Sequence, residues 1–501
     1  MRKKLIYNTA LLTAAALVMR SIGLAFQVWL VGRIGKAGIG LFQLVMSVSG
    51  LAITFAMSGI RFACTRLVSE EMGRGAFGGI GRTVRHCVAY SAFFGTAAAA
   101  ILFFCAEPIG FLWIGDARTV LSLRIYALGL PFASLYSVFA GYFTAMGRVY
   151  KTAAVQISEQ LLRISLVVLF LGRAAEGDLA LSCASVVLAG VIADVVSAGA
   201  MILLYAIDRY LHGQEGGYSD RLTSRMLGVA LPLAVSAYAR NSLSTLEHLL
   251  VPRGLKAAGF SSDSALAGYG IIQGMVFPII TFPACFLMAL SEMLVPDMTE
   301  AQMAGRHEYI AETANSLLEK CLAFAIGAAG LLLCFAEPLT RAIYGSAEAA
   351  PYISLFAVLA PVIYLDMVTD GMLKGLGQHM HSMAYNIIDA AISVILVYTV
   401  LPKFALAGYI AIIYFTECFN FSMSIRRLGS LTELRINAQM MLEPVLCIVF
   451  ATQAAKLFMN YSGFMPVTAL GVMALIAITG AVYAALHLLF TGTNRIPTTD
   501  Q

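Results

Sequence analysis

The sequence predicts an all-α polytopic membrane protein with about fourteen transmembrane helices. Its 501 residues are 59% hydrophobic, with a mean hydropathy of +0.82, and only 12% are charged. A soluble domain carries roughly 25% charged residues. Apolar runs of membrane-spanning length also follow one another along the whole chain. Lipid is therefore the solvent that suits this composition.

Each predicted span is an apolar run that is long enough to cross a bilayer. A helix rising 1.5 Å per residue needs about 20 residues for a ~30 Å hydrocarbon core. The first run begins like a secretory signal but continues as helix to Val31, which favours an uncleaved span. The qualifying runs lie at 5–32, 39–64, 84–105, 119–146, 153–172, 179–207, 225–252, 265–294, 312–335, 350–376, 383–401, 405–425, 437–459 and 464–490.

The distribution of Lys and Arg predicts the orientation of these spans. With a cytoplasmic N-terminus, nineteen of the 33 Lys and Arg residues fall on the cytoplasmic side, ten fall on the opposite side and four lie within spans. Positive charge gathers in cytoplasmic loops. Both termini are therefore expected on the cytoplasmic side of a bacterial plasma membrane.

Charge and cysteine patterns argue against several other functions. The longest basic run is Arg2-Lys3-Lys4, so no nucleic-acid partner is expected. The nine cysteines occur without a CxxC motif or a Cys/His pair at metal spacing, and most lie in apolar runs as small hydrophobes. We expect no catalytic residues, no metal and no cofactor, and therefore not an enzyme.

The two halves of the chain match each other at a constant offset of 230 residues. Span 1 matches span 7 at an offset of 220, which pairs Arg20 with Arg240. The matching positions at offset 230 are Ala106-Glu107-Pro108 with Ala336-Glu337-Pro338, Gly38 with Gly268, Gly40 with Gly270, Gln43 with Gln273, Pro131 with Pro361, Gly141 with Gly371, Gly147 with Gly377 and Glu159 with Asp389.

A six-span unit returns the chain to its starting side, so the two copies are parallel, as in other two-lobed transporters. We predict an N-lobe at 1–207, a cytoplasmic linker at 208–224, a C-lobe at 225–427 and two extra spans with a tail at 428–501. Two pseudo-symmetric lobes around a midplane cavity suit alternating access.

Four arginines fall inside predicted spans. Arg163 has Glu159 four residues before it, and the other three are Arg20, Arg61 and Arg240. A charge at a helix centre costs roughly 2.5–3.5 kcal/mol on insertion scales, so such a residue is functional by default. Guanidinium groups that converge in one cavity suit a phosphate or pyrophosphate, because each fork donates two parallel hydrogen bonds. We predict a pyrophosphate site at these arginines. The alternative is that each one snorkels or pairs with an acid of its own lobe.

Further polar residues are predicted to line the cavity. Glu247 and His248 follow Arg240 on the same helix face, where they either shape the cavity or only neutralise it. Gln43 and Gln273 are repeat mates that we expect to face the cavity as well.

Acidic residues in the spans are candidates for ion coupling. Asp366, Asp370 and Lys374 are spaced i, i+4, i+8, so one carboxylate pairs with the lysine. The other is left for a proton or Na⁺, unless the group is only a structural pair. Asp389 is a further candidate. Glu159 and Arg163, at i, i+4, are expected to form a local ion pair.

Pro131 and Pro361 are repeat mates inside spans, where proline kinks a helix and frees a carbonyl. We predict that they act as hinges.

Several segments resemble the polysaccharide-biosynthesis flippase family of the multidrug/oligosaccharidyl-lipid/polysaccharide exporter superfamily, which includes the lipid II flippase. The resemblance covers nearly the whole chain and is strongest to sporulation proteins. It is carried by Gly35–Phe42, Ile60–Glu71, Gly147–Ser165 and Tyr269–Glu300.

The resemblance implies a V-shaped cavity between two lobes, with cationic residues on the first helix of each lobe. It also implies a lipid-tail groove at the two extra C-terminal helices. The implied function is to flip an undecaprenyl-pyrophosphate-linked sugar, a peptidoglycan or polysaccharide precursor, from the inner to the outer leaflet. The expected partners are this substrate, membrane lipids and a cell-wall polymerase. The alternatives are a cation-coupled multidrug exporter and a non-transporting scaffold for wall synthesis.

Overall fold

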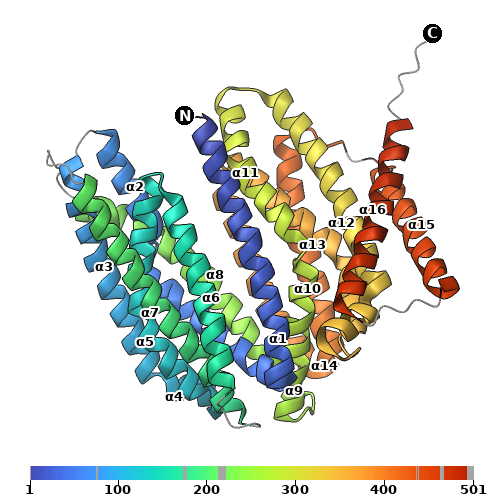
Figure 1. The fold of residues 1–501 in the computed structure, drawn as a ribbon, viewed down its shortest axis with the longest axis horizontal. Helices are drawn as coiled ribbons and strands as arrows, with labels where there is room; N and C mark the ends of the chain where they lie inside the picture. Colours follow the sequence, from blue (N-terminus) through green and yellow to red (C-terminus); the bar gives the residue numbers. More distant parts are fainter. Residues whose placement is uncertain are drawn as a thin grey trace. The chain divides into compact units, whose positions relative to one another are not determined.

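The computed structural model describes residues 2–74, 77–172, 178–212, 222–435, 437, 439–462 and 468–493. Every regular element in these ranges is a helix, which confirms the all-α class (Figure 1). The α-helices are α1 (Arg2–Met57), α2 (Ile60–Gly73), α3 (Phe77–Phe104), α4 (Ala106–Pro108), α5 (Val120–Ala145), α6 (Val149–Leu171), α7 (Leu179–His212), α8 (Leu222–Ala257), α9 (Ser262–Gly270), α10 (Phe277–Thr281), α11 (Ala284–Met303), α12 (His307–Tyr344), α13 (Ala350–Gly375), α14 (His379–Leu431), α15 (Gln439–Ser462) and α16 (Ala469–Thr493). Short π- and 3₁₀-helices are η1 (Ile109–Ile114), η2 (Ala117–Thr119) and η3 (Ile271–Val276).

Twelve helical stretches in the described residues are long and apolar enough to cross a membrane. Two of them contain a non-helical residue at a predicted junction between spans: Gly35 (φ 70°) in α1 and Ala405 (φ 50°) in α14. Counting each of these stretches as two spans gives fourteen, in agreement with the expected number.

Two predicted spans are interrupted. The run at 39–64 breaks at Ser58–Gly59, between α1 and α2. The run at 265–294 is divided into α9, η3, α10 and α11. Pro278 and Pro283 explain the second division, because each lacks the N–H that continues a helical hydrogen-bond ladder.

The chain divides into two compact units. Unit 1 comprises 1–26, 33–270 and 390–409, and unit 2 comprises 27–32, 271–389 and 410–501. These units do not coincide with the two copies of the repeat, so the lobe boundaries remain predictions. Residues 213–221 of the predicted linker and the tail from 494 lie outside the described residues.

Hydrogen bonds with the same separation in sequence join equivalent helices of the repeat in both units. In unit 1, Thr65 on α2 donates to the Gly141 carbonyl on α5 at 3.1 Å, across 76 residues of sequence. In unit 2, Thr299 on α11 donates to the Gly375 carbonyl on α13 at 2.8 Å, also across 76 residues. The threonine bond of unit 2 lies one helical turn beyond Val295 and Gly371, the repeat mates of Thr65 and Gly141. Ser291, at the position that matches Arg61, donates to the Met367 carbonyl with the same separation. The pair α2–α5 therefore has its counterpart in α11–α13.

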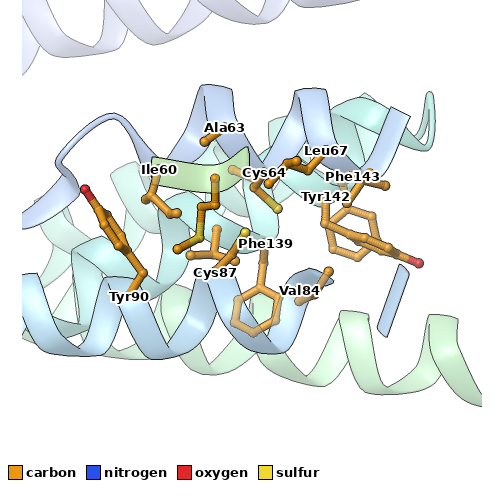
Figure 2. Packing of buried hydrophobic residues seen from close by; sticks show 14 of the residues in the cluster. Ile60, Ala63, Cys64, Leu67, Val84, Cys87, Tyr90, Phe139, Tyr142 and Phe143 are labelled. Carbon is orange, nitrogen blue, oxygen red and sulfur yellow. The ribbon is translucent and has the colours of Figure 1, made fainter. Parts of the chain in front are cut away.

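The best-defined apolar core of unit 1 lies between α2, α3 and α5 (Figure 2). Cys64 and Cys87 are free thiols and are fully buried there among aliphatic and aromatic side chains. They behave as small hydrophobes, as their apolar surroundings in the sequence predict. This core fixes α2, the helix that carries Arg61.

In unit 2, α15 and α16 pack on α12. The Tyr483 hydroxyl donates to the Ala323 carbonyl at 2.6 Å. Gly327 leaves room for that ring, since a Cβ there would lie 2.5 Å from it. The other faces of these helices expose large apolar side chains such as Phe450 and Leu488, as expected in contact with lipid. The lipid-tail groove predicted here remains a prediction.

Candidate functional site

Arg20, Arg61 and Arg240 all belong to unit 1, and all three residues are exposed. Arg20 lies on α1, Arg61 is the second residue of α2 and Arg240 lies in the middle of α8. Arg61 and Arg240 have no carboxylate within 4.0 Å among the described residues. Two guanidinium groups within helices of membrane-spanning length are thus left with unused donors.

Hydrogen bonds bring the segments that carry Arg61 and Arg240 together. The Tyr238 hydroxyl, two residues before Arg240, donates to Ser58 Oγ at 2.7 Å. One helical position after Arg240, the Asn241 amide donates to Thr54 Oγ1 at 2.5 Å. The α8 helix therefore runs beside the end of α1, immediately before the helix that carries Arg61.

This seam between α8 and α1 continues away from the arginines. Thr245 Oγ1 donates to the Ser47 carbonyl at 3.2 Å. Further along α1, Gly40 meets α9, where a Cβ on Gly40 would lie 2.1 Å from the Leu266 carbonyl oxygen. Residues 27–32 of α1 belong to unit 2 and make a separate contact there. The Gln27 amide donates to the Gly274 carbonyl at 3.2 Å.

The backbone break at Ser58–Gly59 was not expected from the sequence. Ser58 (φ 44°) and Gly59 (φ 72°) both adopt positive φ, which is rare for serine. Ser58 is fully buried, and its side chain contacts the hydroxyls of Tyr90 and Tyr238. A Ser-Gly pair inside an apolar run was the available signal, because such pairs are one cause of helix kinks.

The residues predicted to line the cavity have mixed surroundings. In unit 1, His248 Nδ1 is buried without a hydrogen-bond partner among the described residues, and its ring packs edge-on against Tyr269. Glu247 lies near Ser393, whose Oγ is buried and has no hydrogen-bond partner among the described residues. Gln43, in unit 1, and Gln273, in unit 2, are half-buried. Whether these four side chains line a substrate cavity stays a prediction.

Unit 2 contains the acidic group on α13. Lys374 pairs with Asp370 at 2.5 Å, and Ser382 also donates to this carboxylate. Asp366 receives one hydrogen bond, from the Asn420 amide at 3.1 Å, and Ser424 lies near it without bonding. Asp366 Oδ1 and Asn420 Oδ1 are both buried, and no described group donates to either.

The remaining predicted residues can also be placed. Asp389 is half-buried on α14 and has an interacting partner. Pro131 and Pro361 lie inside α5 and α13, which continue as helices through them, and the hinge role stays a prediction. The predicted Glu159–Arg163 ion pair is present at 2.8 Å. Arg163 also binds Asp194 of α7 at 2.8 Å, a partner that spacing along one helix does not reveal.

The fold is shared with solved membrane transporters. The structure of the lipid II flippase MurJ in an inward closed conformation superposes with a TM-score of 0.73 at 12% identity, covering 97% of this chain and 99% of that chain. An inward-facing multidrug resistance MATE family transporter of the MOP superfamily gives a TM-score of 0.62 at 14% identity, covering 84% and 98%. The chain therefore has the fold of a multi-pass membrane transporter of the MOP superfamily.

The family is defined by sequence. A polysaccharide biosynthesis protein family model matches residues 5–289, so the chain belongs to this family. Stage V sporulation protein B of Bacillus subtilis (strain 168) is 24% identical over 404 residues, which are 79% of this chain and 77% of that protein.

Proposed function

We propose that this protein flips an undecaprenyl-pyrophosphate-linked sugar from the inner to the outer leaflet of a bacterial plasma membrane by alternating access. The observation that carries the proposal is the pairing of α8 with the α1–α2 junction. This contact brings together the segments that carry Arg61 and Arg240, both of which lie in helices of membrane-spanning length and have no carboxylate partner in the described residues.

The chemistry of the headgroup matches these arginines. A pyrophosphate presents pairs of anionic oxygens, and a guanidinium donates two parallel hydrogen bonds to such a pair. Arg20, the repeat mate of Arg240, supplies the third cation of the proposed site. The prenyl chain stays in lipid, so the protein has to shield only the polar headgroup during transfer.

The proposed direction follows from the membrane potential. With both termini in the cytoplasm, an anionic headgroup moves outward down a cytoplasm-negative potential. The gain is about 2.3 kcal/mol per charge per 100 mV. The potential therefore suffices in principle to drive the step. Asp366 Oδ1 receives no hydrogen bond from the described residues, and Asp366 is the proposed site of any additional coupling to a proton or Na⁺.

The test is leaflet exchange of a fluorescent undecaprenyl-pyrophosphate-linked sugar in liposomes that contain the purified protein. Arg20→Ala and Arg240→Ala should abolish exchange while the protein still inserts and keeps its helical circular dichroism. Arg66→Ala is the matched control, because Arg66 is an exposed α2 arginine already paired with Glu70. Full exchange in both Arg20→Ala and Arg240→Ala would remove the site. Efflux of ethidium without lipid exchange would instead support the multidrug exporter.

A further inference from the structure

Span 2 is broken at Ser58–Gly59, where both residues adopt left-handed backbone conformations. A side chain at position 59 is excluded, since a Cβ on Gly59 would lie 2.6 Å from the Ala230 carbonyl oxygen of α8. Position 58, however, carries a serine, for which positive φ is strained. Such a conformation persists only where the surroundings hold it in place.

Two tyrosines from other helices hold Ser58. Tyr238 of α8 donates to Ser58 Oγ at 2.7 Å. Ser58 Oγ and the Tyr90 hydroxyl of α3 lie 2.8 Å apart, and Tyr90 donates to the Ser58 carbonyl at 3.2 Å. These contacts can be satisfied with each hydroxyl donating once. Tyr238 donates to Ser58 Oγ, the Ser58 hydroxyl donates to the Tyr90 oxygen, and the Tyr90 hydroxyl donates to the Ser58 carbonyl. The three hydroxyls therefore form a complete relay around the break.

The fold itself does not demand this break. Unit 2 contains the repeat counterpart of Ser58–Gly59 at Met288–Ala289, and this pair lies inside the continuous helix α11. Beyond the break, α2 packs on α5 as α11 packs on α13, as the hydrogen bonds across 76 residues show. Unit 2 interrupts its own span at Phe282–Pro283, but both of these residues keep a right-handed backbone. The left-handed break is therefore specific to the half that carries Arg61.

The break decides where α2 begins and thus the direction of Arg61. Beyond it, α2 is fixed to α5, because a Cβ on Gly141 would lie 2.6 Å from the Arg61 carbonyl oxygen. Before it, α1 is tied to α8 through Tyr238, two residues from Arg240. The Tyr238–Ser58 hydrogen bond is hence the shortest described connection between the backbones of the two arginines.

We propose that Tyr238 is a positioning residue for the pyrophosphate headgroup: its hydroxyl holds Ser58 in the left-handed conformation and so sets Arg61 relative to Arg240. This inference rests on the proposed function. Tyr238 acts through the backbone break and need not touch the substrate. Tyr90 supports the same serine from the opposite helix.

The variant Tyr238→Phe removes only the hydroxyl and keeps the ring that packs on Phe55. Amide hydrogen exchange of the peptide spanning residues 54–64, followed by mass spectrometry, reports opening of the break without reference to any substrate. We expect exchange to accelerate about tenfold, the equivalent of roughly one lost hydrogen bond. Tyr344→Phe, which loses one hydrogen bond to the Met275 carbonyl in unit 2, should leave this peptide unchanged.

The functional readout separates positioning from general damage. In the liposome assay, Tyr238→Phe should raise the half-saturating concentration of the fluorescent lipid-linked sugar about tenfold while the maximal rate changes less. Adding Ser58→Gly should restore the affinity, because glycine adopts positive φ without a clamp. Tyr90→Phe is the second variant if Tyr238→Phe does not fold.

The outcomes are distinct. If the wild-type protein moves no lipid-linked sugar, the proposed function fails, while hydrogen exchange still tests the clamp. Unchanged exchange in Tyr238→Phe and Tyr90→Phe overturns the clamp itself. Faster exchange with an unchanged half-saturating concentration, or no rescue by Ser58→Gly, overturns the positioning role.

Discussion

Gly40 and Gly270, which match each other in the internal repeat, touch each other in the structure: a Cβ on Gly270 would lie 2.8 Å from the Gly40 amide nitrogen. Both residues belong to unit 1. The two repeat mates therefore meet where α1 crosses α9. The only side chain that permits this approach is a hydrogen atom, so glycine is required on both helices.

Gly40→Ala should therefore destabilise the protein. The added methyl group would lie 2.1 Å from the Leu266 carbonyl oxygen, and backbone cannot rotate away as a side chain can. Overpacking of this kind costs about 1–3 kcal/mol. Thermal unfolding in detergent measures the loss. Gly50→Ala is the matched control on the same helix, with no atom within 4 Å of its added Cβ. Equal unfolding midpoints in the two variants would contradict the tight crossing.

Arg240→Lys should separate charge from geometry. Lysine keeps the positive charge but cannot form two parallel hydrogen bonds to paired oxygens. We expect the half-saturating concentration of lipid-linked sugar to rise about tenfold, the loss of roughly 1.4 kcal/mol of binding free energy. The assay is the liposome exchange, with the exposed Arg66→Lys as control. Wild-type affinity in Arg240→Lys would show that a point charge is sufficient at this position.

Asp366→Asn should test ion coupling in unit 2. Asp366 Oδ1 and Asn420 Oδ1 are buried acceptors that no described group donates to, and a bound proton or Na⁺ would satisfy them. If transport responds to a proton or Na⁺ gradient, this variant should remove the response and keep the potential-driven component. Measuring exchange with each gradient imposed in turn decides the point. Asp370→Asn is the comparison, since Asp370 is already paired with Lys374. A gradient response that survives Asp366→Asn places coupling elsewhere.

Asp116 should make the loop before α5 sensitive to acid. Burial raises the pKa of Asp116, but the hydrogen bonds and charge of Arg118 outweigh burial and hold this pKa below its usual value. A lowered folded-state pKa contributes stability above the unfolded value of about 3.9, and that stability is lost as pH falls through the folded value.

The measurement is thermal unfolding against pH. The wild-type protein should lose stability below about pH 4. The variant Asp116→Asn should be less stable than the wild type by about 1 kcal/mol at neutral pH, and its stability should fall less steeply as the pH is lowered below 4. Asp263→Asn serves as the control, because Asp263 contacts the same arginine at 2.9 Å but its side chain is 68% exposed. If the stability of Asp116→Asn falls with acid as steeply as that of the wild type, Asp116 is not the source of the acid sensitivity.

The spans were predictable because hydropathy is a property of each segment by itself. The turn at Gly35 falls between two predicted runs, and Ala405 is the first residue of the run 405–425, so both lie where runs were already separate in the sequence. The interruptions inside runs were harder to foresee. Pro278 and Pro283 gave a strong signal, whereas the Ser58-Gly59 pair gave a weaker one, since serine has no intrinsic preference for positive φ.

The candidate site was predictable only as a set of costly charges. Arg20, Arg61 and Arg240 stand out because arginine is expensive in a lipid environment. The residues that hold these arginines in position do not stand out in the sequence. Tyr238 reaches Ser58 across 180 residues of sequence, and neither residue is unusual in its own segment.

The sequence by itself determined that this chain is an all-helical membrane protein with an internal repeat, because burial of apolar side chains in lipid depends on composition and period alone. The tertiary structure decided that Tyr90 and Tyr238 clamp Ser58, that Gly40 meets Gly270 and that Arg163 takes Asp194 as a second partner. A hydrogen bond or a close helix crossing requires atoms within a few ångströms of each other. Only the packing of helices that are distant in sequence supplies that proximity.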